Sequence, residues 1–264
     1  MTRNTRILMQ CLYWAFVIYL LMPLFLMMLM GFKDSKFVGF PIKSWTFEWY
    51  VGVFKDTQLV KAFFYSTAIG VISTAIALFM GLWIAVALTG RSFMGRAVIL
   101  GLTLLPAVIP GVISAIAFRI ATRFVGMEPG MWAIIWSHAI HNVPFVVLVV
   151  MARLSTLPKS YGEAAQDLGA DPLIAFFRVT LPYLTPAIIG GGAFCMLLSF
   201  DDFVRSFFLG GYEPTLPVLI FAKLRSGMSP EINAIATIVL VLTAILGLWA
   251  ERSMRRMSKR ATND

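Results

Sequence analysis

The chain has 264 residues, of which 59% are hydrophobic and only 13% charged, and its formal net charge is +9. A typical soluble domain carries about 25% charged residues, so this composition excludes an ordinary soluble globular protein. Membrane proteins keep Lys and Arg beside anionic lipid headgroups, so the positive charge indicates membrane lipid as a partner and requires no nucleic acid.

Six runs without Asp, Glu, Lys or Arg are long enough, or nearly so, to cross a bilayer. A crossing needs about 20 apolar residues, because a helix rises about 1.5 Å per residue through about 30 Å of hydrocarbon. We therefore expect an all-α membrane protein with six transmembrane helices in a single domain, residues 1–264. The runs are residues 7–32, 62–90, 97–118, 129–152, 179–200 and 232–250.

The first run follows a basic start, but it is too long for the core of a signal peptide and no small-x-small cleavage site follows it. We expect it to remain as the first span. The 89–96 loop has two arginines in eight residues, whereas the 33–61 segment spreads five lysines over 29 residues. The tail at 252–260 is also strongly basic. Because cytoplasmic loops are enriched in Lys and Arg, we expect both termini to be cytoplasmic.

Two segments outside the runs have their own pattern. The 33–61 segment contains SWTFEWYVGVF, whose aromatic residues suit a helix lying at the membrane interface, with a docking face for a partner protein as the alternative. Between the fifth and sixth runs, TLPVLIFAKL is too short to span and predicts a re-entrant or interfacial helix. Ser229 and Pro230 then predict the start of the sixth span.

Polar residues and prolines mark the third and fourth runs. Pro106 and Pro110 in LLPAVIPG lack the N–H group that continues a helix, which predicts either a movable break beside a cavity or a static kink. His138, His141 and Asn142 form a polar cluster in the fourth run. Hydrogen bonds between helices, a place in a translocation path, and metal or haem ligation by the histidines are all open interpretations.

The segment between the fourth and fifth runs, residues 153–186, is charged and rich in small residues. Residues 161–168 are good helix formers and are followed by Gly169, while Asp171 and Pro172 predict the N-cap and first residue of a second short helix over 173–180. Pro182 and Pro186 are expected to end that pattern before the fifth span. The result is a cytoplasmic helix-turn-helix whose small residues let another surface approach closely.

Two adjacent acids lie within the fifth span. An acid near the centre of a spanning helix costs about 2.5–3.5 kcal/mol, so Asp201 and Asp202 need a compensating cation. We expect the helix to continue through them, Asp201 to pair with Arg205, and Asp202 to face a water-filled path for a cationic substrate. The candidate pathway residues are Asp202, Asp201, His138, Asn142 and Phe200.

The sequence also resembles a known family. Glu163-Ala164-Ala165, then Gly169, then V-x-L-P at 179–182 is similar to the EAA loop of bacterial ABC-importer permeases, with Val179 in place of isoleucine. The segments LSFDDFVRSFFLGG and SHAIHNVPF resemble the spermidine/putrescine subgroup of these permeases. The resemblance implies the type I ABC importer transmembrane domain, with the EAA loop as the element that couples to the ATPase. The implied coupling residues are Glu163, Ala164, Ala165, Gly169, Ala170, Leu181 and Pro182.

That resemblance implies the rest of the assembly. We expect a permease of the bacterial inner membrane, working with a second permease subunit (a different chain), two ATP-binding subunits and a periplasmic solute-binding protein. The chain lacks a phosphate-binding GxxxxGK[ST] loop, so ATP and Mg²⁺ belong to the ATPase, and we expect no catalytic residue, metal or cofactor on this chain. Permeases for other amines, amino acids or organic cations, and a haem-binding membrane redox subunit, are the alternatives.

Overall fold

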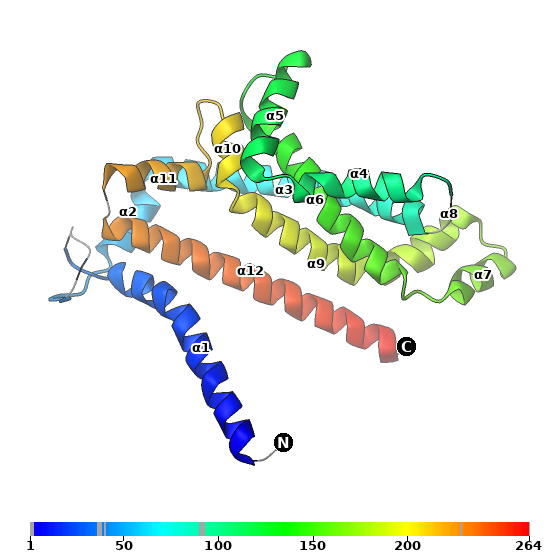
Figure 1. Cartoon of the computed structure of the whole chain (residues 1–264), viewed down its shortest axis with the longest axis horizontal. Coiled ribbons are helices and arrows are strands. Elements are labelled where there is room, and N and C mark those ends of the chain that lie inside the picture. The colour runs from blue at the N-terminus through cyan, green and yellow to red at the C-terminus, as the bar shows by residue number, and fades with distance from the viewer. Residues whose placement is uncertain (1–2, 36–38, 40, 90–92, 228, 264) are drawn as a thin grey trace. The chain divides into compact units, whose positions relative to one another are not determined.

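The computed structural model describes residues 3–35, 39, 41–89, 93–227 and 229–263 (Figure 1). Among these residues, five helices are long and apolar enough to span a membrane, and a sixth is obtained when the bent pair α4–α5 is counted as one span. The six predicted runs therefore appear as helices, while the cytoplasmic location of both termini stays a prediction. The elements are α1 (Arg3–Met30), α2 (Glu48–Lys55), α3 (Thr57–Thr89), α4 (Arg96–Val108), α5 (Gly111–Phe124), α6 (Met131–Leu154), α7 (Lys159–Asp167), α8 (Pro172–Ala175), the π-helical turn η1 (Phe176–Thr180), α9 (Leu181–Phe200), α10 (Phe203–Leu209), α11 (Leu216–Ser226) and α12 (Pro230–Asn263).

The chain divides into two compact units: Met1–Lys61 with Ile220–Leu242, and Ala62–Leu219 with Thr243–Asp264. In the first unit, the spanning part of α1 has no buried residue, so its apolar side chains remain available to lipid or to another subunit. The assignment of 1–264 to a single transmembrane domain stays a prediction.

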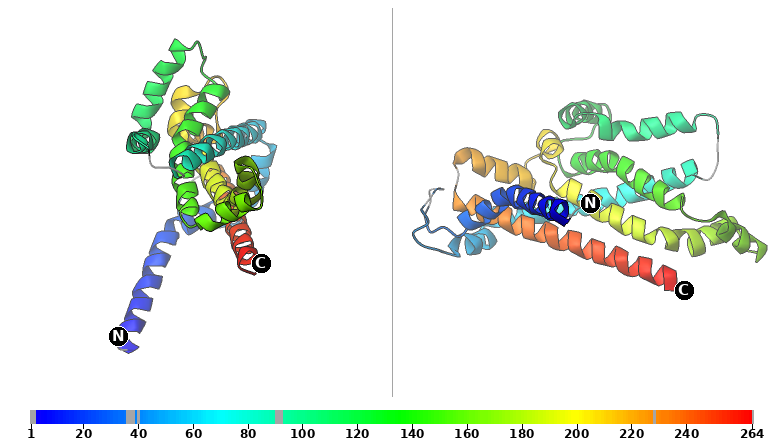
Figure 2. Two further views of the ribbon diagram at one scale, coloured as in Figure 1. Left: turned by 90° about the vertical axis from the view of Figure 1, so that its right-hand side faces the viewer. Right: turned by 60° about the horizontal axis from the view of Figure 1, so that its bottom comes forward.

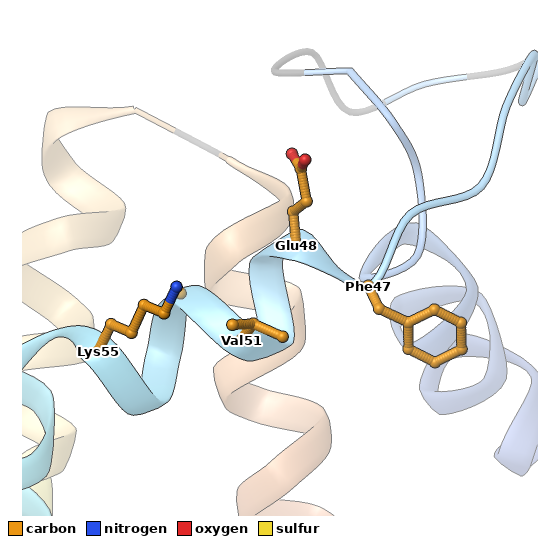
Figure 3. A pocket seen from close by; sticks show the side chains of 5 residues that line it. Phe47, Glu48, Val51 and Lys55 are labelled. Atoms are coloured by element: carbon orange, nitrogen blue, oxygen red, sulfur yellow. The ribbon is translucent and has the colours of Figure 1, made fainter.

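The predicted helix in the aromatic outer segment is α2. Phe47, which precedes this helix, and Val51, which lies in it, are both exposed. With Glu48, Gly52 and Lys55 they line an open pocket on the surface of the helix (Figure 3). The short apolar stretch before the sixth span also forms the expected helix, α11, and α12 begins at Pro230 as predicted. The location of α2 and α11 at the membrane interface stays a prediction.

The core of the second unit is made by α3, α6 and α9. α6 is the most buried of the spanning helices, with 61% of its spanning window inside the protein. Small apolar residues allow the three helices to pack closely, as expected where lipid supplies no hydrophobic driving force between them. The buried cluster contains Ala77, Ala85, Leu88, Val143, Val146, Val147, Val150, Leu184 and Cys195.

Two glycines of α3 mark its closest contacts. A Cβ atom added at Gly81 would lie 2.6 Å from the Cβ atom of Val146 on α6. One added at Gly70 would lie 2.7 Å from the Met196 sulfur on α9. Both distances are shorter than carbon and sulfur atoms tolerate. At Gly81 the neighbour is the rigid Cβ atom of Val146, so only glycine fits there, whereas at Gly70 the flexible end of Met196 would have to move aside.

The third run is broken where its prolines predicted a break. The helix direction bends by 107° between α4 and α5, around Ile109 and Pro110 (Figure 1; Figure 2). Pro110 has no N–H group, so the carbonyl of Pro106, four residues earlier, receives no helical hydrogen bond. The bend and the free carbonyl are therefore consequences of the proline spacing.

One expectation about the fifth run is wrong. Pro182 and Pro186 do not end the preceding helix: α8, η1 and α9 join into a spanning helix, Pro172–Phe200, of 29 residues. In η1 the N–H of Leu181 bonds the carbonyl of Phe176, five residues earlier. Because of this wider turn, the helix continues past Pro182 even though Pro182 has no N–H to donate to the preceding turn.

Candidate functional site

The fifth spanning run is interrupted at its two aspartates. α9 ends at Phe200, Asp201 caps its C-terminus, and Asp202 leaves the helical conformation and starts α10. The Asp202 Oδ1 atom accepts a hydrogen bond of 2.9 Å from the N–H of Arg205, the usual N-cap arrangement for aspartate. The expectation that one helix continues through this run to Leu209 is therefore wrong, because Asp202 begins a new helix.

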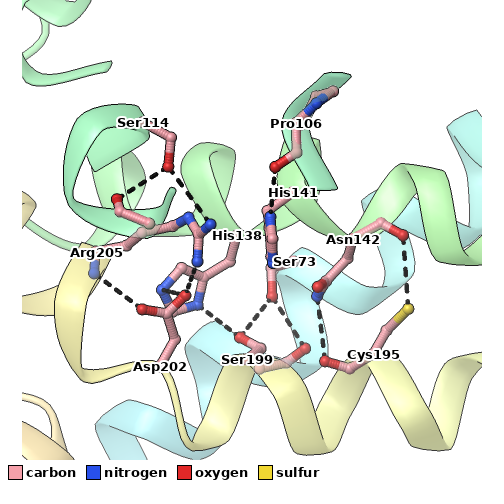
Figure 4. Close-up of polar contacts among 12 residues, drawn as sticks. Ser73, Pro106, Ser114, His138, His141, Asn142, Cys195, Ser199, Asp202 and Arg205 are labelled. Carbon is pink, nitrogen blue, oxygen red and sulfur yellow. Dashed lines mark hydrogen bonds and ion pairs between the residues drawn. The ribbon is translucent and has the colours of Figure 1, made fainter. Parts of the chain in front are cut away.

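The break also decides which aspartate is paired. The Asp202 carboxylate forms an ion pair with the Arg205 guanidinium, and the two side chains are only 10% and 7% exposed. The expected pair between Asp201 and Arg205 is wrong, since these residues no longer share one helix. Asp201 is exposed and takes part in no ion pair among the described residues. Arg205 Nη2 lies 3.5 Å from the Ser114 hydroxyl on α5, so the pair also reaches the bent span (Figure 4).

Hydroxyl groups link His138 to the two helices packed against α6. His138 Nδ1 lies 2.7 Å from Ser199 Oγ on α9, and Ser199 Oγ lies 3.0 Å from Ser73 Oγ on α3. Ser73 in turn donates to the Gly70 carbonyl at 3.2 Å. His138 is 2% exposed, so these bonds are made inside the protein.

The neighbouring polar residues of α6 also bond other helices. Asn142 donates to the Cys195 carbonyl on α9 at 3.1 Å. His141 Nδ1 donates to the free Pro106 carbonyl of α4 at 3.0 Å. Interhelical hydrogen bonding, one of the interpretations left open by the sequence, is therefore confirmed for the whole cluster. Phe200 packs edge-to-face on Phe63, with 5.8 Å between ring centroids.

The sequence did not reveal the serines of this site. Three serines lie within mostly apolar helices: Ser73, Ser114 and Ser199. Ser199 contacts His138 and Ser114 contacts Arg205, two residues that the sequence did single out. A hydroxyl in a spanning helix commonly bonds a neighbouring helix, which was the available signal. Their partners depend on helix packing and could not be read from spacing. In the described part of the chain, no group of three or more His, Cys, Asp or Glu is placed to hold a metal ion.

The small-residue loop between α6 and α9 has the predicted turn. After α7, Gly169 has a φ of +83°, which favours glycine, and its N–H bonds the Gln166 carbonyl at 2.8 Å. The N–H of Ala170 bonds the Ala165 carbonyl at 3.0 Å. These two bonds form a Schellman cap, and α8 starts at once from Asp171.

Five of the seven residues of the predicted coupling element lie on or beside this turn. Glu163 and Ala164 are exposed on α7, whereas Ala165 and Ala170 are half-buried. Leu181 and Pro182 lie at the start of α9 and do not belong to the turn. Large apolar side chains are also exposed around the turn, as expected of a surface that another protein covers. They are Tyr161, Leu168, Leu173, Ile174 and Phe177.

A second charged cluster joins α11 and α12 to the start of α3. Lys223 Nζ lies 2.8 Å from Asp56 and 2.9 Å from Glu231. Burial alone would raise the pKa of Asp56, but hydrogen bonds from Lys223 and from the N–H groups of Leu59 and Gln58 lower it below its ordinary 3.8. Burial acts to lower the pKa of Lys223, but its two carboxylate partners raise it above 10.5. The cluster therefore holds its charges at neutral pH.

Comparison with known proteins gives relatives over nearly the whole chain. Residues 77–263 match a family model described as "Binding-protein-dependent transport system inner membrane component". The chain is 32% identical over 252 residues to the spermidine/putrescine transport system permease protein PotC of Escherichia coli K12, covering 95% of each. It is 35% identical over 266 residues to the putrescine transport system permease protein PotI of the same strain, covering 95% of this chain and 94% of the relative.

Solved structures share the fold. A bacterial ABC transporter involved in importing the acidic polysaccharide alginate has a chain with a TM-score of 0.74 at 18% identity, covering 96% of this chain and 98% of that one. A chain of the MetNI methionine ABC transporter gives a TM-score of 0.65 at 19% identity, covering 75% and 95%. The predicted fold, the transmembrane domain of a type I ABC importer, is confirmed.

Proposed function

Because this chain belongs to the family of binding-protein-dependent transport system inner membrane components, we propose that it is a permease subunit of a bacterial ABC importer for a small polycationic amine such as putrescine or spermidine. The family and the apolar helices make it a multi-pass protein of the inner membrane. The names of two relatives support the amine, since both are permeases for putrescine or spermidine.

The observation that carries the substrate class is the charge at the α9–α10 break. Asp201 and Asp202 place two carboxylates where a spanning run is interrupted, and Arg205 neutralises one of them. An acid inside a membrane is costly unless a cation or a water-filled path compensates it. An amine passing this point would provide that cation for Asp201. His138, Asn142 and Phe200 belong to the same proposal as the surrounding wall of the path.

The proposed power source is a separate ATPase. The turn between α7 and α8, with Glu163, Ala164, Ala165, Gly169 and Ala170, is the proposed contact, because it combines a rigid cap with exposed apolar side chains. Leu181 and Pro182 would carry movement from that contact into α9. The complete importer would contain two ATP-binding subunits, a second, different permease chain and a periplasmic binding protein. ATP and Mg²⁺ would be bound by the ATPase, with no cofactor on this chain.

The proposal is tested with the complete complex in liposomes. The chain is co-expressed with its neighbouring ATPase, partner permease and binding protein, and ATP-driven uptake of labelled putrescine and spermidine is measured. Saturable uptake that requires ATP supports the proposal, and Asp201→Asn should reduce it while the complex still assembles. Full uptake by that variant would remove Asp201 from the path. Stimulated ATP hydrolysis without amine uptake would refute the amine and leave the permease assignment standing.

A further inference from the structure

One nitrogen of the His138 ring has no hydrogen-bond partner among the described residues. This atom, Nε2, is buried and lies 3.9 Å from the Oδ2 atom of Asp202 (Figure 4). A separation of 3.9 Å is too long for a direct hydrogen bond. Buried polar atoms nearly always have partners, so this nitrogen requires an explanation.

The serine chain offers one arrangement of protons that explains the free nitrogen. When Ser73 donates its hydroxyl proton to the Gly70 carbonyl, it accepts a proton from Ser199. Ser199 has then used its own proton and accepts from His138 Nδ1. In this arrangement the neutral ring carries its proton on Nδ1, and Nε2 presents a lone pair toward Asp202.

In this arrangement two acceptors face each other. The Asp202 carboxylate is paired with Arg205, and the adjacent, exposed Asp201 adds a second carboxylate, so these three groups together carry one negative charge. A donor nitrogen placed about 2.8–3.0 Å from each acceptor would bridge them. Resting on the proposed function, we propose that His138 Nε2 and the Asp202 carboxylate together bind an ammonium group of the transported amine through its N–H bonds.

This arrangement sets a chemical requirement on the substrate. A primary or secondary ammonium group supplies both the charge and the N–H donors. In the hexamethyl derivative of putrescine both nitrogens are quaternary, so it supplies the same charge but no hydrogen-bond donor, and Nε2 stays without a partner. A hard divalent cation prefers a shell of oxygen ligands and gains little from imidazole. The site therefore selects amines over other small cations.

Two substitutions test the roles of the two His138 ring nitrogens one at a time. His138→Asn keeps an amide N–H close to the Nδ1 position, where it can bond Ser199, and removes the Nε2 acceptor. His138→Gln instead places an amide oxygen close to the Nε2 position. The matched control is His141→Asn, on the same helix, because His141 bonds the Pro106 carbonyl and not Asp202.

The first measurement uses the complete complex in liposomes with saturating, putrescine-loaded binding protein. We measure putrescine molecules transported per ATP hydrolysed, and we measure the amount of assembled complex beside it so that a packing defect is recognised. We expect His138→Asn to lower the ratio about tenfold or more, corresponding to the loss of one hydrogen bond to a charged group, and His138→Gln to restore most of it. His141→Asn should stay within about twofold of the unaltered complex.

The second measurement isolates recognition by the membrane part. Purified permease–ATPase complex without the binding protein is heated with putrescine or with its hexamethyl derivative at equal concentration. Putrescine should raise the unfolding temperature, the hexamethyl derivative should not, and His138→Asn should remove the shift.

Three results would overturn the inference. An unchanged transport ratio in His138→Asn would mean that a water molecule or a ring proton satisfies Nε2. Equal losses in the Asn and Gln variants, with less assembled complex, would assign His138 to packing alone. Equal stabilisation by putrescine and its hexamethyl derivative would remove the N–H requirement. If the unaltered complex transports no amine at all, the proposed function itself fails and the inference with it.

Discussion

Removing Arg205 should destabilise this chain far more than removing an exposed arginine. The Arg205 and Asp202 side chains are 7% and 10% exposed, so Arg205→Met leaves the Asp202 carboxylate buried without its cation. Breaking a buried ion pair from one side costs about 3–5 kcal/mol, because the remaining charge is desolvated and unpaired. The Asp202 bond to the backbone N–H of position 205 remains, so we expect a value near the lower end of that range.

A second substitution separates the charge from the shape of the site. Asparagine is as good an N-cap as aspartate, so Asp202→Asn keeps the start of α10 while removing the charge. In the double variant, Asp202→Asn with Arg205→Met, no buried charge is left unpaired, and the cost should fall to about 1–2 kcal/mol. The free energy of unfolding is measured by denaturant titration of the purified protein in mixed micelles, and the four proteins form a double-mutant cycle.

The chain supplies its own control pair. Arg255 and Glu251 are also bonded but lie on the surface, with 75% and 47% of their side chains exposed. Arg255→Met should therefore cost only about 0.3–0.5 kcal/mol. The reasoning is refuted if Arg205→Met costs no more than Arg255→Met, or if the costs of the two site substitutions simply add in the double variant.

Three further predictions concern packing, backbone and pH. Gly81→Ala should destabilise by about 1–3 kcal/mol through overpacking, whereas Gly101→Ala, with open space around its new Cβ, should be neutral or stabilising; thermal unfolding of both variants decides this. Gly169→Ala forces a side chain into a φ of +83° at a cost of about 1 kcal/mol and should reduce the amount of ATPase that co-purifies; unchanged co-purification contradicts a role for this turn in docking. Asp56 contributes stability that is complete above its ordinary pKa of 3.8 and is lost as the pH falls through its lowered value, while the contribution of Lys223 is lost as the pH rises through its raised value above 10.5. The stability difference between the unaltered chain and Lys223→Met should therefore shrink at both extremes, and a difference independent of pH would show that the contact is not electrostatic.

Features that depend on local sequence were predicted well. The spanning runs, the broken third run, the turn at Gly169 and the start of α12 at Pro230 all follow from runs of apolar residues or from the conformations of glycine and proline. Each of these signals acts within a few residues. Such signals do not depend on how the rest of the chain packs.

Features that depend on competing local signals or on packing were predicted poorly. The prediction for Asp202 used its direction around a continuous helix. Aspartate is also a strong N-cap, and this second property determines the structure. Pro182 was read as a helix end, although a π-helical turn lets the helix continue past it. The serine that bonds His138 lies 61 residues further along the chain, and only the contact between α6 and α9 brings the two together.

The uninterrupted helix from Pro172 to Phe200 has a mechanical consequence. Its 29 residues, at about 1.5 Å each, make a lever of about 44 Å. One end leaves the capped turn that is the proposed ATPase contact, and the other stops at the two aspartates. In the proposed importer, a push on the turn would reach the carboxylates as a tilt or slide of one stiff element, with no intervening hinge other than the single wide turn at Phe176–Thr180. A movement of the ATPase on one side of the membrane would thus directly displace the aspartates proposed to bind the amine.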